Sequence, residues 1–280
     1  MSAIAEKRAT FRKLHESGCF AIPNPWDIGS ARYLEHLGFK ALATTSAGFA
    51  FSRGLPDNAV PRDMMLAHIR ELVEATDVPV NADFENGYAH EPDRVAENVR
   101  LCLETGVAGL SIEDSTGDKA KPLYELDHAV ARMQAARTAI DKRGDDVMLI
   151  GRAECFLVGR PNIEEVTRRL KAYADAGADC LYAPGIRTRE EIAAVVKSVA
   201  PKPVNLLIGG AIGLTMNDAA ALGVRRVSVG GALARAAWGG FMRAAKDLAE
   251  NGRFDGFENA APHGELNDLL CEDMIRRQQR

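Results

Sequence analysis

Acidic residues follow two apolar segments in the middle of the chain. Asp83–Tyr88 comes after the apolar run Val78–Val80, and Ser111–Asp114 comes after Val107–Leu110. Acidic side chains are depleted in strands, and they are costly to bury without a partner. Oxygen ligands at adjacent strand ends suit Mg²⁺, which keeps several waters and leaves positions open for substrate oxygens. The pattern predicts a metal-dependent enzyme with the ligands Asp83, Glu85 and Glu113.

Each of these carboxylates also has a simpler interpretation, because acidic residues at strand–helix junctions often cap a helix or form an ion pair. Asp114 in particular is either a helix or turn cap or a part of the metal site. Arg152 follows another predicted strand and faces the acidic groups. A guanidinium matches a carboxylate bidentately, so Arg152 is predicted to contact an anionic substrate. The alternative is a structural ion pair of Arg152 with Glu154 or Glu113.

The elements that must position these residues alternate regularly along the chain. The predicted strands are Cys19–Pro23, Ala41–Thr45, Val78–Ala82, Gly109–Glu113, Val147–Arg152, Cys180–Ala183, Pro203–Leu207 and Arg226–Val229. Helical spacing between them includes Pro61–Glu74, Asp93–Thr105, Leu126–Asp141, Ile163–Ala176, Arg189–Ser198 and Thr215–Ala221. Strands that alternate with helices pair in parallel, which predicts an α/β fold, a (β/α)₈ TIM-type barrel, with a doubly wound sheet as the alternative. In such a barrel the catalytic groups lie at the C-terminal ends of the strands.

The two ends of the chain carry more sequence than eight strand–helix units require. Residues 1–16 are expected to form an extra N-terminal helix across the bottom of the barrel. Residues 232–280 are expected to contain a helix at 232–250 and a second near 266–277. We predict a single domain over residues 1–280, with the 232–280 extension making contacts in a homo-oligomer.

The composition excludes several other classes of function. The net charge is −4 with 26% charged residues, which gives no electrostatic footprint for nucleic acid. We expect no membrane association, because no apolar run is long enough to span a bilayer and residues 1–16 lack a secretory apolar core. The five cysteines are scattered and form no Cys-x-x-Cys pair, so we expect reduced thiols, no zinc and a cytoplasmic location.

Seven segments in the same order resemble the isocitrate lyase/phosphoenolpyruvate mutase superfamily. This superfamily includes 2-methylisocitrate lyase, phosphoenolpyruvate mutase, phosphonopyruvate hydrolase and a group of oxaloacetate decarboxylases. The resemblance extends from Phe20 to Phe254. The matching segments are Asn24–Asp27, Thr45–Gly48, Gly54–Asp57, Asp83–Tyr88, Ile112–Asp114, Gly151–Glu154 and Pro203–Asn205.

The resemblance implies a barrel whose last helix is exchanged with a neighbouring subunit, in a dimer or commonly a homotetramer. It implies Mg²⁺ or Mn²⁺, bound directly by Asp83 and largely through water by Glu85 and Glu113. The substrate would be a small 2-oxo or 2-hydroxy carboxylate. Its predicted contacts are Thr45, Ser46, Ala47, Arg152 and Asn205. Asp57, which lies in a sequence typical of a turn, matches an aspartate on a mobile loop near the reacting centre.

Two departures from the family pattern bear on the reaction. The lyases carry a cysteine acid in the loop after the fourth strand, where this chain has Lys119-Ala120-Lys121-Pro122. The methylisocitrate lyases carry a glutamate after the sixth strand, where this chain has Ala183-Pro184-Gly185. We therefore predict a Mg-dependent carbon–carbon lyase, of the oxaloacetate decarboxylase or methylisocitrate lyase kind, that forms a metal-stabilised enolate. Lys119, Lys121 or solvent would protonate that enolate.

Two other functions remain open from the sequence. Within the family, phosphoenolpyruvate mutase or phosphonopyruvate hydrolase chemistry at a P–C bond would use the same enolate and the same metal. The alternative that is not an enzyme is a non-catalytic barrel that binds a 2-oxo acid.

Overall fold

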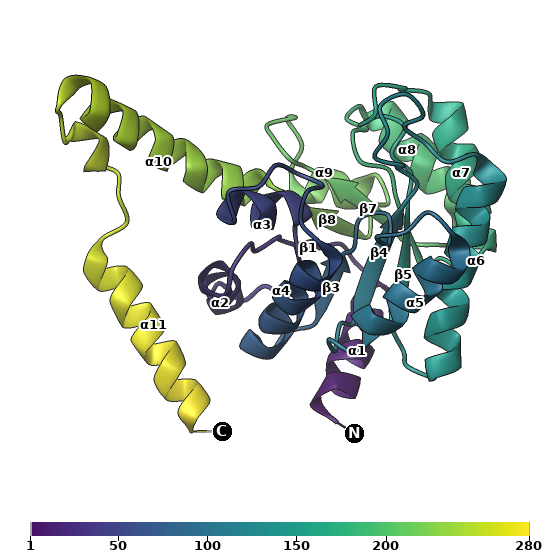
Figure 1. Ribbon diagram of the computed structural model, residues 1–280, viewed down its shortest axis with the longest axis horizontal. Helices are drawn as coiled ribbons and strands as arrows, with labels where there is room; N and C mark the ends of the chain where they lie inside the picture. The colour runs from purple at the N-terminus through teal and green to yellow at the C-terminus, as the bar shows by residue number, and fades with distance from the viewer. Residues whose placement is uncertain (1, 280) are drawn as a thin grey trace. The chain divides into compact units, whose positions relative to one another are not determined.

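Eight parallel strands form a nearly closed barrel in the computed structural model, which describes residues 2–279 (Figure 1). The strands are β1 (Phe20–Ile22), β2 (Leu42–Ala43), β3 (Val80–Asp83), β4 (Gly109–Glu113), β5 (Met148–Arg152), β6 (Cys180–Tyr182), β7 (Val204–Leu207) and β8 (Arg226–Ser228). Each lies within a predicted strand or overlaps it. The predicted (β/α)₈ barrel is confirmed.

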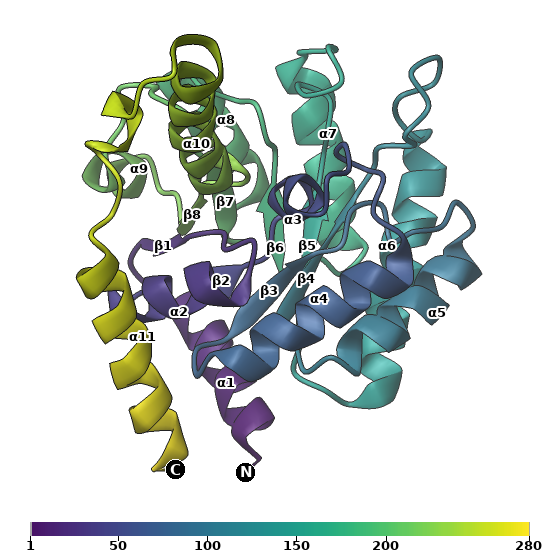
Figure 2. The same cartoon turned by 60° about the vertical axis from the view of Figure 1, so that its left-hand side comes forward.

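Helices connect successive strands on the outside of the barrel. They are α2 (Ile28–His36), α3 (Ser46–Ser52), α4 (Arg62–Ala75), α5 (Pro92–Leu103), α6 (Leu126–Arg143), α7 (Ile163–Asp175), α8 (Arg189–Val199) and α9 (Met216–Ala221). The side chains of Asp27, Thr188 and Thr215 cap α2, α8 and α9 in capping boxes that satisfy first-turn N–H groups. α4 runs along the outer side of β3 (Figure 2).

The strand ladder runs in the order β1-β8-β7-β6-β5-β4-β3-β2, so β1 and β2 are its two ends. The Ala43 N–H donates to the Pro23 carbonyl at 3.0 Å and thereby joins these ends. The Asn24 side chain reinforces the junction. Its amide donates to the Thr44 carbonyl at 2.9 Å, and its oxygen accepts from the N–H groups of Val229 and Gly230.

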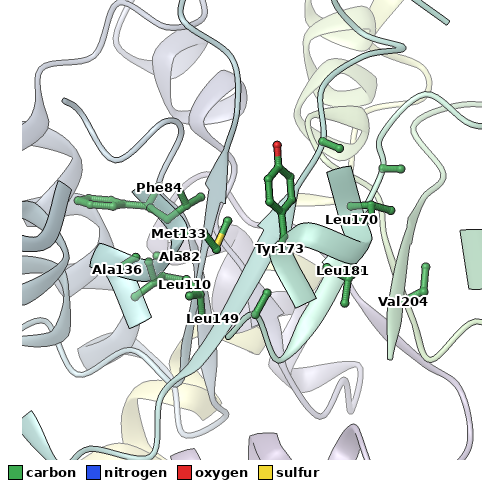
Figure 3. Close-up of a cluster of buried hydrophobic side chains, with 14 of the residues drawn as sticks. Ala82, Phe84, Leu110, Met133, Ala136, Leu149, Leu170, Tyr173, Leu181 and Val204 are labelled. Carbon is green, nitrogen blue, oxygen red and sulfur yellow. The ribbon is translucent and has the colours of Figure 1, made fainter. Parts of the chain in front are cut away.

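Side-chain alternation along the strands divides the apolar core into two parts. Outward-facing residues pack under the helices, and Figure 3 shows strand residues such as Leu110, Leu149 and Leu181 beside Met133 of α6 and Tyr173 of α7. Inward-facing residues, including Ile22, Met148 and Ile150, fill the barrel. Alternation therefore carries Asp83, Glu113 and Arg152, at the ends of β3, β4 and β5, toward the barrel axis.

The N-terminal helix α1 (Ala3–Leu14) closes the amino-terminal end of the barrel, as predicted (Figures 1 and 2). Its Phe11 is fully buried and belongs to the interior cluster. Gly109 makes room for it, since a Cβ there would lie 2.7 Å from Phe11 Cε1. α1 thus covers the apolar interior at the amino-terminal ends of the strands.

His15, which follows α1, gives the fold a pH dependence. Burial, with Arg226 second, lowers the pKa of His15 to about 3. Between pH 6.5 and pH 3 the unfolded chain therefore binds more protons at this residue than the folded chain. The free energy of unfolding should fall as the pH falls, by up to about 1.4 kcal/mol per pH unit from this group. Urea unfolding between pH 7 and pH 4 measures how the free energy of unfolding changes with pH. His15→Gln should make this pH dependence weaker, whereas His36→Gln, at an exposed histidine, should not. The same pH dependence in His15→Gln and in the wild type would contradict the assignment.

Residues 232–280 form a second compact unit, separate from residues 1–231. It contains α10 (Ala232–Asn251), the short 3₁₀ helix η1 (Asp255–Phe257) and α11 (His263–Gln278). Large apolar side chains are exposed along it, including Trp238, Phe241, Met242, Phe254 and Phe257. An exposed apolar surface of this kind is typical of a segment that contacts another chain. Its exchange between subunits remains a prediction.

No helix of residues 2–279 combines the length and the apolar character that crossing a lipid bilayer requires.

Candidate active site

Three charged side chains meet where β3, β4 and β5 end. Asp83, Glu113 and Arg152 are the last residues of these strands, and Glu113 and Arg152 are direct neighbours in the ladder. Arg152 Nη1 lies 3.2 Å from Asp83 Oδ1 and 3.2 Å from Glu113 Oε2. Parallel strands thus bring the predicted metal ligands and the predicted substrate arginine to one edge of the barrel.

Glu154 completes the group; the sequence suggested it only as an ion-pair partner of Arg152. Its carboxylate accepts a hydrogen bond from Arg152 Nε. The Arg152 guanidinium also lies 5.2 Å from the centre of the Tyr182 ring, within the range of a cation–π contact. Although burial opposes its charge, Glu154 and Glu113 raise the pKa of Arg152 above its ordinary value. The structural ion pairs considered for Arg152 therefore exist, with both Glu154 and Glu113.

The start of α3 orients Asp83. Ser46 donates its backbone N–H and its hydroxyl to Asp83 Oδ2, at 3.0 and 2.9 Å. Thr44 Oγ1 accepts from the Asp83 N–H at 2.8 Å, and Thr45 caps α3 by accepting from the Gly48 N–H. Thr45 was predicted to end a strand and no helix was predicted after it, whereas Ser46 and Ala47 form the first turn of α3. Thr45 supplied the missed signal, since threonine is a good N-cap.

Glu85 is held by a strained loop. Glu85 and Tyr88 have φ values of 46° and 55°, in the left-handed region that non-glycine residues seldom adopt. The Tyr88 hydroxyl donates to Glu85 Oε1 at 2.9 Å, and the Glu85 carbonyl accepts from the Glu113 N–H at 3.0 Å. Strain of this kind persists where the surroundings fix the backbone, and it is frequent at functional sites. The sequence gave no indication that Tyr88 contacts Glu85.

Negative charge exceeds positive charge in this group. Asp83, Glu85, Glu113 and Glu154 are four carboxylates around the single guanidinium of Arg152. Burial, with Asp83 second, raises the pKa of Glu85 to about 7. Burial also raises the pKa of Glu113 and of Glu154 despite the opposing effect of Arg152.

This charge imbalance suits a further cation. Within residues 2–279 no three His, Cys, Asp or Glu side chains converge as a ready-made metal site. The expected arrangement has Asp83 as the direct ligand and Glu85 and Glu113 acting through water, so it does not require such convergence. A divalent cation would favour the ionised form of these carboxyls, which burial now disfavours. The donor set therefore fits Mg²⁺ or Mn²⁺.

Asp114, whose role the sequence left open, points away from this group. Its Oδ2 accepts from the Tyr173 hydroxyl at 2.6 Å and from Arg169 Nη1 at 3.1 Å, and its Oδ1 accepts from the Glu154 N–H at 2.8 Å. In Figure 3 the Tyr173 hydroxyl extends out of the apolar cluster. Asp114 therefore anchors the backbone after β5, which carries Arg152 and Glu154.

We predict that Asp114→Asn lowers the free energy of unfolding by about 2–4 kcal/mol, because buried Arg169 loses one of its two charged partners and keeps only Glu165. Urea unfolding measures the change. The matched control is Asp175→Asn, which removes an exposed carboxylate at the end of α7. Equal small effects of the two substitutions would show that the Asp114 anchor is unimportant.

Asp57 and Lys119 lie in loops that follow β2 and β4, at the end of the barrel where Asp83 and Glu113 also lie. Asp57 is on the exposed loop before α4, and partial burial, with Asp83 second, raises its pKa. A cavity of about 320 Å³, here called the mouth cavity, is lined by Asn58, Ser115, Lys119 and Leu157, among others. These residues belong to the loops after β2, β4 and β5. The structure thus brings Lys119 and the residue after Asp57 to one cavity.

Two predicted site residues are placed elsewhere. Lys121 lines a different cavity, described below. Asn205 is fully buried inside the barrel, where its Nδ2 donates to Ser228 Oγ and its Oδ1 accepts from Arg226 Nε, both at 2.9 Å. Its contacts are with the barrel interior, and its role toward a substrate stays a prediction.

Comparisons with known proteins agree with this architecture. The sequence model of the family described as phosphoenolpyruvate phosphomutase matches residues 11–249. A solved structure of a putative lyase/mutase from Burkholderia cenocepacia J2315 is 49% identical, with a TM-score of 0.93 over 96% of this chain and 98% of that one.

Two relatives carry the name of a substrate. Oxaloacetate decarboxylase from Paraburkholderia xenovorans is 33% identical over 79% of this chain and 74% of its own length. A structure of oxaloacetate acetylhydrolase in complex with oxalate is 28% identical, with a TM-score of 0.85 over 99% of this chain and 98% of that one. The barrel, the clustered carboxylates and these matches agree that the chain belongs to the isocitrate lyase/phosphoenolpyruvate mutase superfamily, whose members are lyases and mutases that generally depend on a divalent metal.

Proposed function

We propose that this protein is a Mg²⁺- or Mn²⁺-dependent lyase that cleaves a carbon–carbon bond of a small 2-oxo or 2-hydroxy dicarboxylate. The observation that carries the proposal is the surplus of buried carboxylates at the ends of β3 and β4, beside a single arginine. A purely structural ion-pair cluster would match its charges, because unpaired buried carboxylates destabilise the fold. In a site that binds a divalent cation, the bound ion neutralises the surplus carboxylates.

The residues have separable tasks in this proposal. Asp83, fixed by Ser46, would hold the cation directly, and Glu85 and Glu113 would hold its water ligands. The cation, when bound, supplies positive charge for the oxygen of the 2-oxo group as the bond breaks.

Arg152 would bind a substrate carboxylate. Its Nε and Nη1 contact protein carboxylates, so the second terminal nitrogen is the group that we assign to the substrate. Thr45 and Ala47, at the start of α3, would contact the other carboxylate.

Decarboxylation of an oxaloacetate-like acid suits the proton donors present. Carbon dioxide leaves without receiving a proton, so no acid of the lyase cysteine type is needed for the bond to break. The carbon that lost the carboxylate then takes up one proton. Lys119, in the mouth cavity, or solvent would deliver it. If the substrate carries a hydroxyl instead, Asp57 would accept the hydroxyl proton in a retro-aldol cleavage.

A panel of small acids tests the proposal. Purified protein is incubated with oxaloacetate, 2-methylisocitrate, 2,3-dimethylmalate and phosphonopyruvate, each with Mg²⁺ and with a chelator, and the products are identified by mass spectrometry. Metal-dependent pyruvate with carbon dioxide is the expected result. Because oxaloacetate also decarboxylates without enzyme in the presence of divalent cations, the rate is compared with that of the Asp83→Ala protein. No metal-dependent turnover above that background would sink the proposal.

P–C bond chemistry is the second candidate function, and the observation in its favour is the match to the phosphoenolpyruvate phosphomutase family. It shares the metal site and the charge on the 2-oxo oxygen. In the same panel, phosphate release from phosphonopyruvate would identify a hydrolase, and phosphoenolpyruvate formation would identify a mutase.

A further inference from the structure

The loop after β4 separates two cavities. Residues 115–123, here called the hairpin loop, are closed by an antiparallel bridge between Ser115 and Leu123 and by the hydrogen bond from the Thr116 N–H to the Pro122 carbonyl at 3.0 Å. Lys119 lines the mouth cavity. Lys121 lines a second cavity of about 480 Å³, here called the outer cavity, together with Leu123, Tyr124, Glu125, His128 and Arg160. The two lysines of the loop therefore have different surroundings.

Three basic side chains from three elements surround the outer cavity. Lys121 comes from the hairpin loop, His128 from α6 and Arg160 from the loop before α7. Within the described residues 2–279, neither the Lys121 ammonium nor the Arg160 guanidinium has an ion pair or a side-chain hydrogen bond. Arg168 and Arg169 of α7 differ, since both pair with Glu165. Lys121 and Arg160 repel one another, and Glu125, the carboxylate that lines the same cavity, forms an ion pair with neither within residues 2–279. An anion would relieve that repulsion.

The polar groups of the cavity wall are already fixed. His128 Nε2 lies 2.9 Å from the His90 carbonyl oxygen, and His90 Nδ1 contacts the Tyr124 hydroxyl at 2.5 Å. The Arg132 guanidinium stacks on the Tyr124 ring at 4.0 Å from its centre. A wall held in this way requires little rearrangement when a ligand binds, which favours affinity.

The wall also limits the chemical class of the ligand. The side chains of Leu123 and Tyr124 supply apolar surface, so the cavity suits an organic body as well as a charged head. Glu125 is the single carboxylate among the residues that line it, and it opposes an anion. The lining therefore carries two cationic side chains without an ion pair in the described part of the chain, Lys121 and Arg160, together with one histidine and one carboxylate.

We propose that the outer cavity is a binding site for a small organic anion with a multivalent head group, a phosphate ester or a polycarboxylate, distinct from the site at the strand ends. Arg160 and Lys121 bind the head group with charge-assisted hydrogen bonds, and Leu123 and Tyr124 contact the rest of the ligand. The site does not depend on the reaction that the strand ends catalyse.

Calorimetric titration of the full chain tests this site, with inorganic phosphate, glycerol 3-phosphate and propane-1,2,3-tricarboxylate as the probes. We expect at least one organic probe to bind with a Kd of about 1 mM or below at low salt. Arg160→Gln should weaken binding about tenfold or more, and Lys121→Gln similarly, because each removes a charge-assisted hydrogen bond. Arg70→Gln, at an exposed arginine of α4, is the matched control and should leave the Kd within about twofold of wild type.

Glu125→Gln provides a test of opposite sign. It removes the opposing carboxylate, so the same anion should bind severalfold more tightly. A mere loss of local structure would weaken binding instead.

Preference for glycerol 3-phosphate over the tricarboxylate would identify a phosphate site, and the reverse preference a carboxylate site. The proposal is overturned if no probe binds at up to about 10 mM, a value well above typical metabolite-site affinities. It is equally overturned if Arg160→Gln and Arg70→Gln have the same affinity, which would locate the anion elsewhere.

Discussion

Replacing Asp83 with alanine is expected to lower kcat/KM for the substrate found in the acid panel by about 10³-fold, because charge stabilisation at the reacting oxygen is commonly the largest single contribution to catalysis. The residue is the proposed direct ligand, and both Ser46 hydrogen bonds converge on it. The fold should persist, because Arg152 keeps Glu113 and Glu154 as partners. Circular dichroism and gel filtration check that point.

The metal itself gives a readout that is independent of turnover. Electron paramagnetic resonance with Mn²⁺ should show about tenfold or greater loss of affinity in Asp83→Ala, since a ligand is removed outright. Asp63→Ala, at an exposed aspartate of α4, is the matched control and should bind Mn²⁺ as the wild type does. Wild-type activity in Asp83→Ala would remove the metal proposal.

Arg152→Met should have the second large effect, on stability as well as on activity. The substitution leaves Asp83, Glu113 and Glu154 without their shared cation, and breaking a buried ion pair from one side costs about 3–5 kcal/mol. Urea unfolding in the presence of a chelator at pH 8 should show this loss. Activity should fall about 10²-fold or more, because a substrate carboxylate loses its guanidinium partner.

The pH dependence of the stability loss in Arg152→Met distinguishes the loss of charge pairing from the loss of packing. The orphaned carboxyls take up protons more readily than those of the unfolded chain, so the folded variant gains stability relative to pH 8 as the pH falls. The difference from wild type should therefore be smaller at pH 5.5 than at pH 8. Adding Glu154→Gln to Arg152→Met should recover part of the stability at pH 8. A loss that is the same at both pH values would indicate lost packing in place of lost charge pairing.

The fold could be predicted from the sequence because each strand is a short apolar run between helical segments. Periodicity and turn residues are local signals, and the barrel follows from their repetition. The helix α3 was missed because Ser46–Ser52 is short and follows β2 without a turn. Its cap, Thr45, was interpreted as the last residue of a strand and as a substrate contact.

The grouping of Asp83, Glu113 and Arg152 was predictable from the sequence, but the partners of these side chains were less so. Position at a strand end brings Asp83, Glu113 and Arg152 together, and alternation in Met148–Arg152 already indicates that Arg152 points inward. The sequence suggested ion pairs of Arg152 with Glu154 or Glu113, but it could not show that Asp114 pairs with a different arginine. Glu154 pairs with Arg152 and Asp114 pairs with Arg169 and Tyr173, although these two acids look equivalent along the chain.

Position in a loop was predicted least well. Lys119 and Lys121 are two residues apart, and only the closed hairpin loop sends them to different cavities. For Asn205 the strand was predicted correctly but the partners were not. Its place on β7 is clear from the sequence, whereas Ser228 and Arg226, to which it hydrogen-bonds, come from β8. Tertiary neighbours of this kind leave no local trace in a sequence.

The junction between β1 and β2 has a consequence for motion. The strand ladder is continuous elsewhere. At this junction the Asn24 side chain links the end of β1 to Thr44, after β2, and to Val229 and Gly230, after β8. Because the strand ladder is interrupted here, we expect opening of the barrel to begin at this junction and its amide hydrogens to exchange with solvent first. Such opening would displace Thr44 and Ser46, whose hydrogen bonds hold Asp83, so the stability of this junction would affect how firmly Asp83 is held.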